Sequence, residues 1–395
     1  MTAGTSPSRP VRTVFLVATE ESGDRLGASL MKTLRQRLGA DVRFQGVGGG
    51  GMEREGLVSL FPITDLSIMG VAAVARQLPM ILRRIRETTA AVIAASPDTL
   101  VIIDSPDFTH RVARRVRKRA PSIPIIDYVS PTVWAWRPGR ARAMRGYVDH
   151  VLALLPFEPD AHRRLGGPPC TYVGHPLFQE RAVLRPSAAE AARRAAHPPV
   201  IVVLPGSRRS EVRHMIGAIG KTLDRLHTMG IEFEPVLPTL PHVHGLVLEA
   251  VRGWTVKPRI VVGEDDRRAA FRMARAALAK SGTVTLELAI AGVPMVTGYA
   301  ATAIEAFVAR QLVKAFSAIL PNLIVGEAVI PEYMQSLWAP EHLAPALRDI
   351  LGDTPLRQRQ IEAFARLDEI MSTGVQSPSE RAADIVIAHL RTKTP

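Results

Sequence analysis

A turn in the second half of the sequence carries residue types that hold a phosphate. Gly206 follows the apolar run 200–204, and Ser207 and Arg208 open a polar helical pattern after it. Backbone N–H groups at the start of a helix attract anions, glycine permits close approach, and arginine adds positive charge. We therefore predict that this strand, turn and helix start hold a diphosphate. A plain structural turn is the alternative, because glycine is common at such junctions.

A second turn of the same kind follows the apolar run 276–279. Its residues Ser281, Gly282 and Thr283 offer N–H groups and hydroxyls at the start of another helical pattern. Glu287 lies six residues after Ser281, where its carboxylate can accept hydrogen bonds from the two hydroxyls of a ribose. Two such turns in one half of the chain are harder to explain as coincidence than one.

Acidic side chains follow two apolar runs in the first half of the sequence. Glu20, Ser22 and Asp24 come directly after the first run, and Asp104 directly follows the run 99–103. Open α/β sheets bind ligands at the carboxyl ends of their strands, so we expect these residues to face a cleft. A carboxylate such as Asp104 can accept a proton from an attacking hydroxyl. For Asp24, capping of the following helix is an equally good interpretation.

Two of the four tryptophans, Trp134 and Trp136, lie close together beside Arg137 and several prolines. Such a stretch packs poorly as a regular element, which indicates a shaped wall for a sugar face or an acyl chain. Aromatic residues interleaved with arginine would also suit single-stranded nucleic acid. His175 lies between glycine and proline, where a ligand contact and a hydrogen-bonded loop histidine fit equally well.

The net charge of +13 calls for an anionic partner. Phosphorylated ligands, nucleic acid and acidic lipid headgroups would each answer it, and so would a solvated basic face. An apolar loop beside an arginine-bearing helix is what a membrane-surface segment needs, because apolar groups enter lipid and cations meet phosphates; core packing is the alternative. The residues of this predicted membrane contact are Ile68, Met69, Val71, Arg83, Arg84 and Arg86.

The elements that position these residues alternate between apolar runs and helical patterns along the chain. This alternation predicts an α/β protein with parallel sheets, and 395 residues exceed one ordinary core. The pattern restarts after the Ala-, Arg- and Pro-rich segment 179–199, and we place the linker near residue 180. We predict a domain at 1–178, a second at 179–370, and a C-terminal helix at 371–395 that packs across the domains or is exchanged between subunits. The glycine-rich run 46–51 lacks the spacing of a dinucleotide site.

Membrane-spanning and disulfide-bonded classes are not expected. No run of about eighteen apolar residues is present, and the first strand pattern follows the polar N-terminus without a signal-peptide core. The single cysteine, Cys170, excludes an intrachain disulfide and a cysteine-built metal site, which indicates the cytoplasm.

Taken together, the motifs resemble those of the lipid-A-disaccharide synthase family of Gram-negative bacteria. The block 128–137, from Tyr-Val-Ser-Pro to Trp-Ala-Trp-Arg, is highly specific. The other matching stretches, in the family's order, are Glu20 with 22–24, 67–70, Asp104 with 106–108, 154–158, 174–175, 204–208, 281–283 with 286–287, and 320–323. The local departures are Glu21 in place of a small residue, a 48–51 run without the family's Pro-Arg, and the segment 315–319.

The resemblance implies a glycosyltransferase of the B fold, with two Rossmann-like domains facing across a cleft. It implies transfer of 2,3-diacylglucosamine from its UDP derivative to 2,3-diacylglucosamine 1-phosphate (lipid X), giving the β-1,6-linked disaccharide 1-phosphate and UDP. Family members bind the donor in the C-terminal half, are peripheral membrane proteins and include domain-swapped dimers. We therefore expect a cytoplasmic enzyme at the anionic inner-membrane surface, with a homodimer as one option and with no nucleic acid partner and no cofactor.

Site roles follow from the same resemblance. Asp104 matches the family's proposed catalytic aspartate, so we expect it to be the base that activates the acceptor hydroxyl, with Glu20 beside it. Arg208 and the helix starts after Ser207 and Ser281 would stabilise the departing UDP without a metal, since no Asp-x-Asp pair is present. The residues expected to position the substrates are Ser22, Asp24, Ser130, Trp134, Trp136, Arg137, His175 and Asn322.

Two other functions remain open at this point. One is another UDP-sugar glycosyltransferase or epimerase of the same fold. The other is a non-catalytic relative that binds anionic lipid or nucleic acid, which the charge of +13 favours. The presence of every candidate site residue argues against the second, because a protein without catalysis need not keep them.

Overall fold

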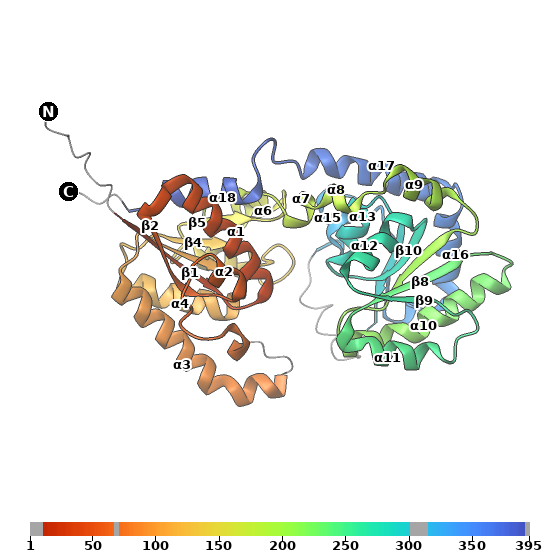
Figure 1. Cartoon of the computed structure of the whole chain (residues 1–395), viewed down its shortest axis with the longest axis horizontal. Coiled ribbons are helices and arrows are strands. Elements are labelled where there is room, and N and C mark those ends of the chain that lie inside the picture. Colours follow the sequence, from red (N-terminus) through yellow and green to blue (C-terminus); the bar gives the residue numbers. More distant parts are fainter. Residues whose placement is uncertain (1–10, 67–70, 301–314, 392–395) are drawn as a thin grey trace, which may run out of the picture. The chain divides into compact units, whose positions relative to one another are not determined.

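The computed structural model describes residues 11–66, 71–300 and 315–391, and the chain divides into two compact units. Unit 1 comprises Met1–His175 with Thr373–Pro395, and unit 2 comprises Pro176–Ser372. Each unit contains one six-stranded parallel sheet with helices around it (Figure 1). The predicted α/β class with two Rossmann-like units is therefore confirmed.

The sheet of unit 1 has the strand order β2-β1-β3-β4-β5-β6. Its strands are β1 (Arg12–Ala18), β2 (Val42–Val47), β3 (Thr99–Ile103), β4 (Ile125–Tyr128), β5 (His150–Ala153) and β6 (Cys170–Tyr172). Its helices are α1 (Glu21–Leu38), α2 (Gly50–Arg54), α3 (Val71–Ala95), α4 (Pro106–Arg119), α5 (Gly139–Met144), α6 (Glu158–Arg164) and α18 (Pro378–Ala388).

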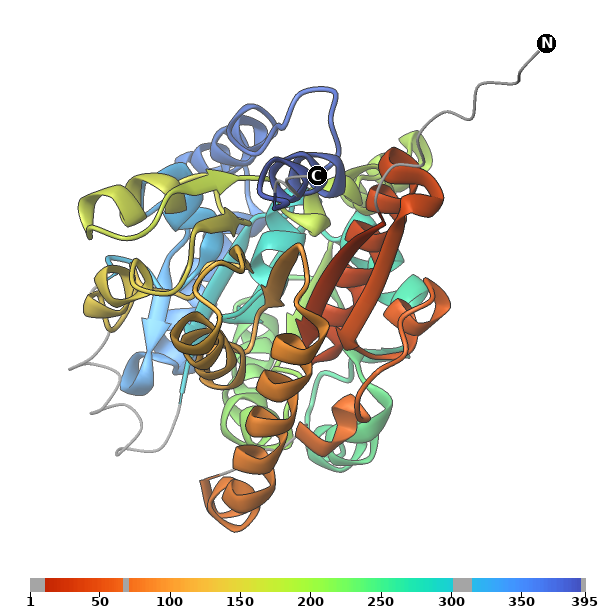
Figure 2. The same cartoon turned by 90° about the vertical axis from the view of Figure 1, so that its left-hand side faces the viewer.

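Helices cover both faces of this sheet, which explains why β3 is buried along its whole length. Leu100 and Ile102 pack into a core formed with α3, α4 and α5. Val101 and Ile103 point the other way, into a core formed with α1 and α18. The C-terminal helix α18 lies beside α1, as both views show (Figures 1 and 2). Residues distant in sequence thereby complete one core.

The sheet of unit 2 has the strand order β12-β11-β10-β7-β8-β9. Its strands are β7 (Val200–Leu204), β8 (Glu234–Thr239), β9 (Arg259–Val262), β10 (Ala276–Lys280), β11 (Met295–Tyr299) and β12 (Glu332–Met334). Its helices are α7 (Pro176–Gln179), α8 (Arg181–Leu184), α9 (Ala188–Ala195), α10 (Arg209–Thr228), α11 (Pro241–Val251), α12 (Glu264–Met273), α13 (Val284–Ile290), α15 (Leu320–Val325), α16 (Pro340–Leu351) and α17 (Pro355–Ile370).

The strand orders place a switch point in each sheet. In unit 1, successive strands run outward in opposite directions from the pair β1 and β3; in unit 2, they do so from the pair β7 and β10. Helices leave neighbouring strands toward opposite faces at such a point, which opens a crevice at the carboxyl ends of the two strands. Glu20 and Asp104 follow the first pair, and Gly206 and Ser281 follow the second.

The Ala-, Arg- and Pro-rich segment 179–199, with which the predicted second domain begins, contains the helices α8 and α9. Helix α9 begins with a capping box, in which Ser187 and Glu190 satisfy each other's backbone N–H groups. Arg194 then donates hydrogen bonds to four backbone carbonyls of unit 2, including those of Phe271 and Gly292. The segment therefore folds as part of unit 2.

Across the described ranges, the helices are too short or too polar to cross a lipid bilayer.

Candidate active site

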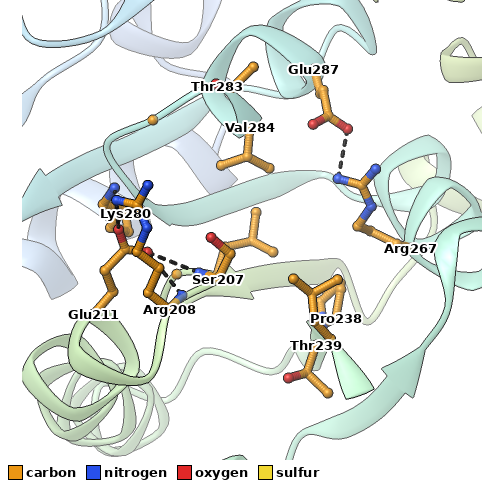
Figure 3. Close-up of a pocket in the computed structure, with 14 residues that line it drawn as sticks. Ser207, Arg208, Glu211, Pro238, Thr239, Arg267, Lys280, Thr283, Val284 and Glu287 are labelled. Atoms are coloured by element: carbon orange, nitrogen blue, oxygen red, sulfur yellow. Dashed lines mark hydrogen bonds and ion pairs between the residues drawn. The ribbon is translucent and has the colours of Figure 1, made fainter. Parts of the chain in front are cut away.

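A pocket of about 440 Å³ lies at the switch point of unit 2 (Figure 3). Six of the seven predicted donor-site residues line it, from the turn after β7 and from the turn and helix after β10. Its full lining is Leu204, Gly206, Ser207, Arg208, Glu211, Pro238, Thr239, Leu240, Arg267, Lys280, Gly282, Thr283, Val284 and Glu287. Two turns distant in sequence thus meet at one cavity because their strands are neighbours in the sheet.

The first turn differs from the sequence expectation in one respect. The N–H groups of Ser207 and Arg208, expected to be free, donate to Oε2 of Glu211 at 3.0 and 3.3 Å. Gly206 has φ 120°, and a Cβ there would lie 2.7 Å from that same oxygen. Glycine is therefore required both by the backbone conformation and by the carboxylate beside it. The physical reason for the difference is that the Glu211 side chain, in the first turn of α10, folds back and caps these N–H groups, which sequence spacing alone did not reveal.

Lys280, which was not among the predicted site residues, is the last residue of β10 and extends toward the first turn. Its Nζ lies 3.1 Å from Oε1 of Glu211 and 5.1 Å from the centre of the Tyr299 ring. Arg208 Nη1 approaches Oε1 of Glu211 at 3.4 Å. Two cations therefore converge at the pocket wall, where a diphosphate would need them. Its position immediately before the turn 281–283 is the sequence signal by which Lys280 could have been identified as a site residue.

Glu287, the predicted ribose ligand, forms an ion pair with Arg267 of α12 at 2.8 Å. Burial raises the pKa of Glu287, and the Arg267 charge opposes that rise. Arg267 was not predicted, because nothing near it in sequence marks it. Ser281 lines no part of the pocket; its hydroxyl and its N–H both donate to the carbonyl of Gly298 on β11. Ser281 therefore fixes the second turn to the sheet.

In unit 1, the structure brings Glu20, Ser22 and Asp104 together at the carboxyl ends of β1 and β3. The Ser105 hydroxyl donates to Oε1 of Glu20 at 2.8 Å, and the Ser105 N–H donates to Oδ1 of Asp104 at 2.7 Å. Both Asp104 and Ser105 have positive φ, 54° and 44°, although neither is glycine. Such backbone strain costs of the order of 1–3 kcal/mol per residue and tends to concentrate at functional sites.

The surroundings of Asp104 favour its protonated form. Burial raises its pKa, and the negative charges of Glu20 and Asp127 act in the same direction. Hydrogen bonds from the Ser105 N–H and from the Ser22 hydroxyl oppose the rise. A carboxylate with a raised pKa is better matched to receiving a proton near neutral pH, which is what a general base requires.

Asp24 is buried and turned toward the glycine-rich loop. Its carboxylate accepts hydrogen bonds from the N–H groups of Gly49, Gly51 and Met52 at 2.7–2.9 Å. It therefore caps α2, and not the helix α1 to which it belongs. A Cβ at Gly51 would lie 2.6 Å from Oδ2 of Asp24, so the loop has closed onto the carboxylate.

The tryptophan stretch is held by buried polar groups. Trp134 Nε1 donates to Oε1 of Glu158 at 3.1 Å, and the Leu155 N–H donates to Oε2 at 2.9 Å. Burial raises the pKa of Glu158 to about 7. Ser130 is buried, with its hydroxyl 2.8 Å from Nε2 of His162. Glu158 and His162 were not among the predicted site residues, and the structure adds them as residues that hold Trp134 and Ser130 in place.

Arg137 is exposed, and Trp136, like Trp134, is half-buried. The Arg137 guanidinium lies 4.3 Å from the Trp136 ring centre, a cation–π contact that fixes both side chains. Trp136 Nε1 donates to the Thr132 hydroxyl at 2.9 Å, which ties the stretch to itself. An aromatic face beside an arginine is therefore available near β4.

His175 is half-buried, and Asn322 lies in the interior of unit 2. Burial lowers the pKa of His175 to about 4, so its ring is neutral near neutral pH. Asn322 is fully buried, donating to the Ile330 carbonyl and to Glu332 and accepting from the Val329 and Ile330 N–H groups. Its amide therefore shapes the loop after α15.

The predicted membrane contact is only partly described. Ile68 and Met69 lie outside the described residues, and Val71 opens α3. Arg84 pairs with Asp65 and Glu87, and its guanidinium lies 4.4 Å from the Phe61 ring centre. It is therefore committed to packing within unit 1. Arg83 and Arg86 on the same helix are exposed.

Comparison with known proteins identifies relatives over nearly the whole chain. The family model for lipid-A-disaccharide synthetase matches residues 14–386. The lipid-A-disaccharide synthase of Rhodopseudomonas palustris (strain ATCC BAA-98 / CGA009) is 67% identical over 381 residues, covering 96% of this chain and 97% of that protein. The same enzyme of Nitrobacter hamburgensis is 67% identical over 376 residues, covering 95% of each chain.

Solved structures with low sequence identity share the fold. A UDP co-structure of MnaA from S. aureus has a TM-score of 0.62 at 12% identity, covering 97% of this chain and 99% of that one. The glycosyltransferase of kitacinnamycin has a TM-score of 0.61 at 17% identity, covering 97% of this chain and all of that one. Both units of the chain therefore have counterparts among glycosyltransferases and related proteins.

Proposed function

Because this chain belongs to the lipid-A-disaccharide synthase family, we propose that it joins the two diacylglucosamine halves of lipid A in a single transfer. It is a glycosyltransferase with the B fold of that class. The donor is UDP-2,3-diacylglucosamine and the acceptor is 2,3-diacylglucosamine 1-phosphate (lipid X). The products are the β-1,6-linked disaccharide 1-phosphate and UDP. The match across residues 14–386, at 64–67% identity to several named synthases, carries this proposal.

The unit 2 pocket is the donor site in this proposal. Its volume of about 440 Å³ suits a nucleotide, and Arg208 and Lys280 supply positive charge for the diphosphate. The Glu287 carboxylate, held by Arg267, accepts hydrogen bonds from the ribose hydroxyls. Release of UDP adds a negative charge to the leaving phosphate. The cations of Arg208 and Lys280 stabilise that charge without a protonation step.

Asp104 acts on the acceptor. Its carboxylate takes the proton of the 6-hydroxyl as that oxygen attacks the anomeric carbon, and the bond from that carbon to the UDP oxygen breaks on the opposite face. The raised pKa of Asp104 supports this role, because the carboxyl must hold the proton until UDP has left. Glu20, hydrogen-bonded to Ser105, orients the acceptor beside it.

The enzyme works at a cytoplasmic membrane surface in this proposal. Exposed Arg83 and Arg86 on α3 supply charge for anionic headgroups, and both substrates carry acyl chains that reside in the membrane. A homodimer, with exchange of the C-terminal helix α18 between subunits, is the proposed assembly and is checked by the mass in solution.

One assay tests the function. The purified protein is incubated with UDP-2,3-diacylglucosamine and lipid X, and UDP and the tetraacyl disaccharide 1-phosphate are measured by mass spectrometry. Formation of both in equal amounts is the expected result. A parallel incubation with UDP-N-acetylglucosamine alone detects epimerisation. Epimerised sugar without disaccharide would assign the chain to the epimerase alternative, and absence of both products would refute catalysis.

A further inference from the structure

We propose that Lys280 and Glu211 form a charge-exchange pair in the donor pocket: Lys280 leaves Glu211 to bind the diphosphate of the donor and returns to it when UDP departs. The proposal rests on the proposed function, since it concerns how the same pocket handles its ligand. Lys280 would be a phosphate-binding residue, and Glu211 a positioning residue that competes with the phosphate.

The position of Lys280 points to this role. Its Nζ lies 3.1 Å from Oε1 of Glu211, the α10 residue whose carboxylate accepts hydrogen bonds from the first turn. The same Nζ lies 3.4 Å from where a Cβ of Gly282 would stand in the second turn. The ammonium therefore sits between the two turns that the sequence marks as phosphate-binding (Figure 3). Its side chain is 17% exposed, so the charge is enclosed yet reachable from the pocket.

Glu211 makes the contacts that a phosphate oxygen would make. Its carboxylate, 7% exposed, accepts from the Ser207 and Arg208 N–H groups and pairs with the cations of Lys280 and Arg208. Two turn amides and two cations are the donor set of a phosphate site. In the structure this set is filled by an anion belonging to the chain, which keeps the cations compensated and in place.

The charges favour an exchange and not a static arrangement. One carboxylate faces two cations, so the cluster keeps a positive excess that a diphosphate can use. A lysine ammonium is a compact charge on a flexible stem with three donors, so it can turn from one anion to another. The Tyr299 ring, 5.1 Å from Nζ, provides a surface along which the ammonium can turn. After transfer, Glu211 competes for Lys280 and thereby assists the release of UDP.

The test compares UDP with uridine, which lacks the diphosphate, by calorimetry at fixed ionic strength. Lys280→Met should lower the ratio of UDP affinity to uridine affinity by about 10- to 100-fold, the range for a charge-assisted hydrogen bond. Glu211→Gln keeps one oxygen acceptor for the turn but removes the competing charge, so the ratio should rise by roughly threefold or more and UDP should dissociate more slowly. Lys221→Met, at an exposed position of α10, is the matched control and should leave the ratio unchanged.

The outcomes separate the two proposals. An unchanged ratio in Lys280→Met, or a lowered ratio in Glu211→Gln, overturns the charge exchange while the donor site stands. Failure of the folded wild-type protein to bind UDP overturns the donor site itself. A substitution that only loosens the turn lowers the affinities for UDP and for uridine together and leaves their ratio unchanged. An unchanged ratio in Glu211→Gln therefore also contradicts the charge exchange. The ³¹P spectrum of bound UDP provides an independent check, because loss of Lys280 should move the diphosphate resonances and loss of Lys221 should not.

Discussion

Replacing Glu158 with glutamine should remove a pH-dependent component of the stability of unit 1. Glu158 is buried, and its carboxyl group is bound by Trp134 Nε1 and by the Leu155 N–H. Burial raises the pKa of Glu158 from its ordinary value of 4.5 to about 7. The folded protein therefore binds a proton at this position between those pH values, whereas the unfolded chain does not.

The direction of the effect follows from the linkage between proton binding and folding. Because the pKa is higher in the folded state, the stabilising contribution is complete below pH 4.5 and is lost as the pH rises to about 7. At about 1.4 kcal/mol per pKa unit, the contribution of Glu158 to the free energy of unfolding changes by about 3 kcal/mol over the full pH range. About 2 kcal/mol of this change falls between pH 5.5 and pH 8. Glutamine cannot ionise, so the variant lacks this loss.

Urea unfolding of both proteins at pH 5.5 and pH 8 measures the effect. All other titrating groups are shared, so the free energy of unfolding of the wild type minus that of Glu158→Gln should fall by about 2 kcal/mol between the two pH values. Glu53→Gln, at an exposed position of unit 1, is the matched control. A difference for Glu158→Gln that stays constant within about 0.5 kcal/mol would refute the assignment of a raised pKa to this carboxyl.

Three further predictions concern the proposed activity. Asp104→Asn should lower kcat by roughly 10²- to 10⁴-fold with little change in UDP affinity, and near-native turnover in the disaccharide assay would remove Asp104 as base. Gly206→Ala should weaken UDP binding by at least about tenfold and destabilise unit 2 by about 1–3 kcal/mol, because φ there is 120° and the new Cβ would press on Glu211; calorimetry and urea unfolding measure the two effects. Reversal of charge at Arg83 and Arg86 should reduce co-sedimentation with anionic vesicles by roughly tenfold or more, at about 1 kcal/mol per arginine, and unchanged binding would exclude this helix as the contact.

Much of the architecture was predictable because its signals are local. Strand β7 is a short apolar run ended by proline and glycine, and β3 is one ended by Asp104, so both were visible as strands followed by site residues. The two phosphate-type turns were visible for the same reason. Helix α9 was not predicted as a separate element, although its segment was placed in the second domain, because neighbouring prolines mark breaks in regular structure and masked its capping box.

The order of the residues alone therefore determined the α/β class and which strand ends carry acids, glycines and arginines, since strand, turn and helix signals span only a few neighbours. Tertiary structure decided what those groups do to one another. Glu20 and Ser105, separated by 85 positions, share a hydrogen bond only because β1 and β3 are adjacent. Lys280 meets Glu211 only because β10 lies beside β7. Charge, burial and proton affinity depend on such contacts through space, and no local pattern in the sequence records them.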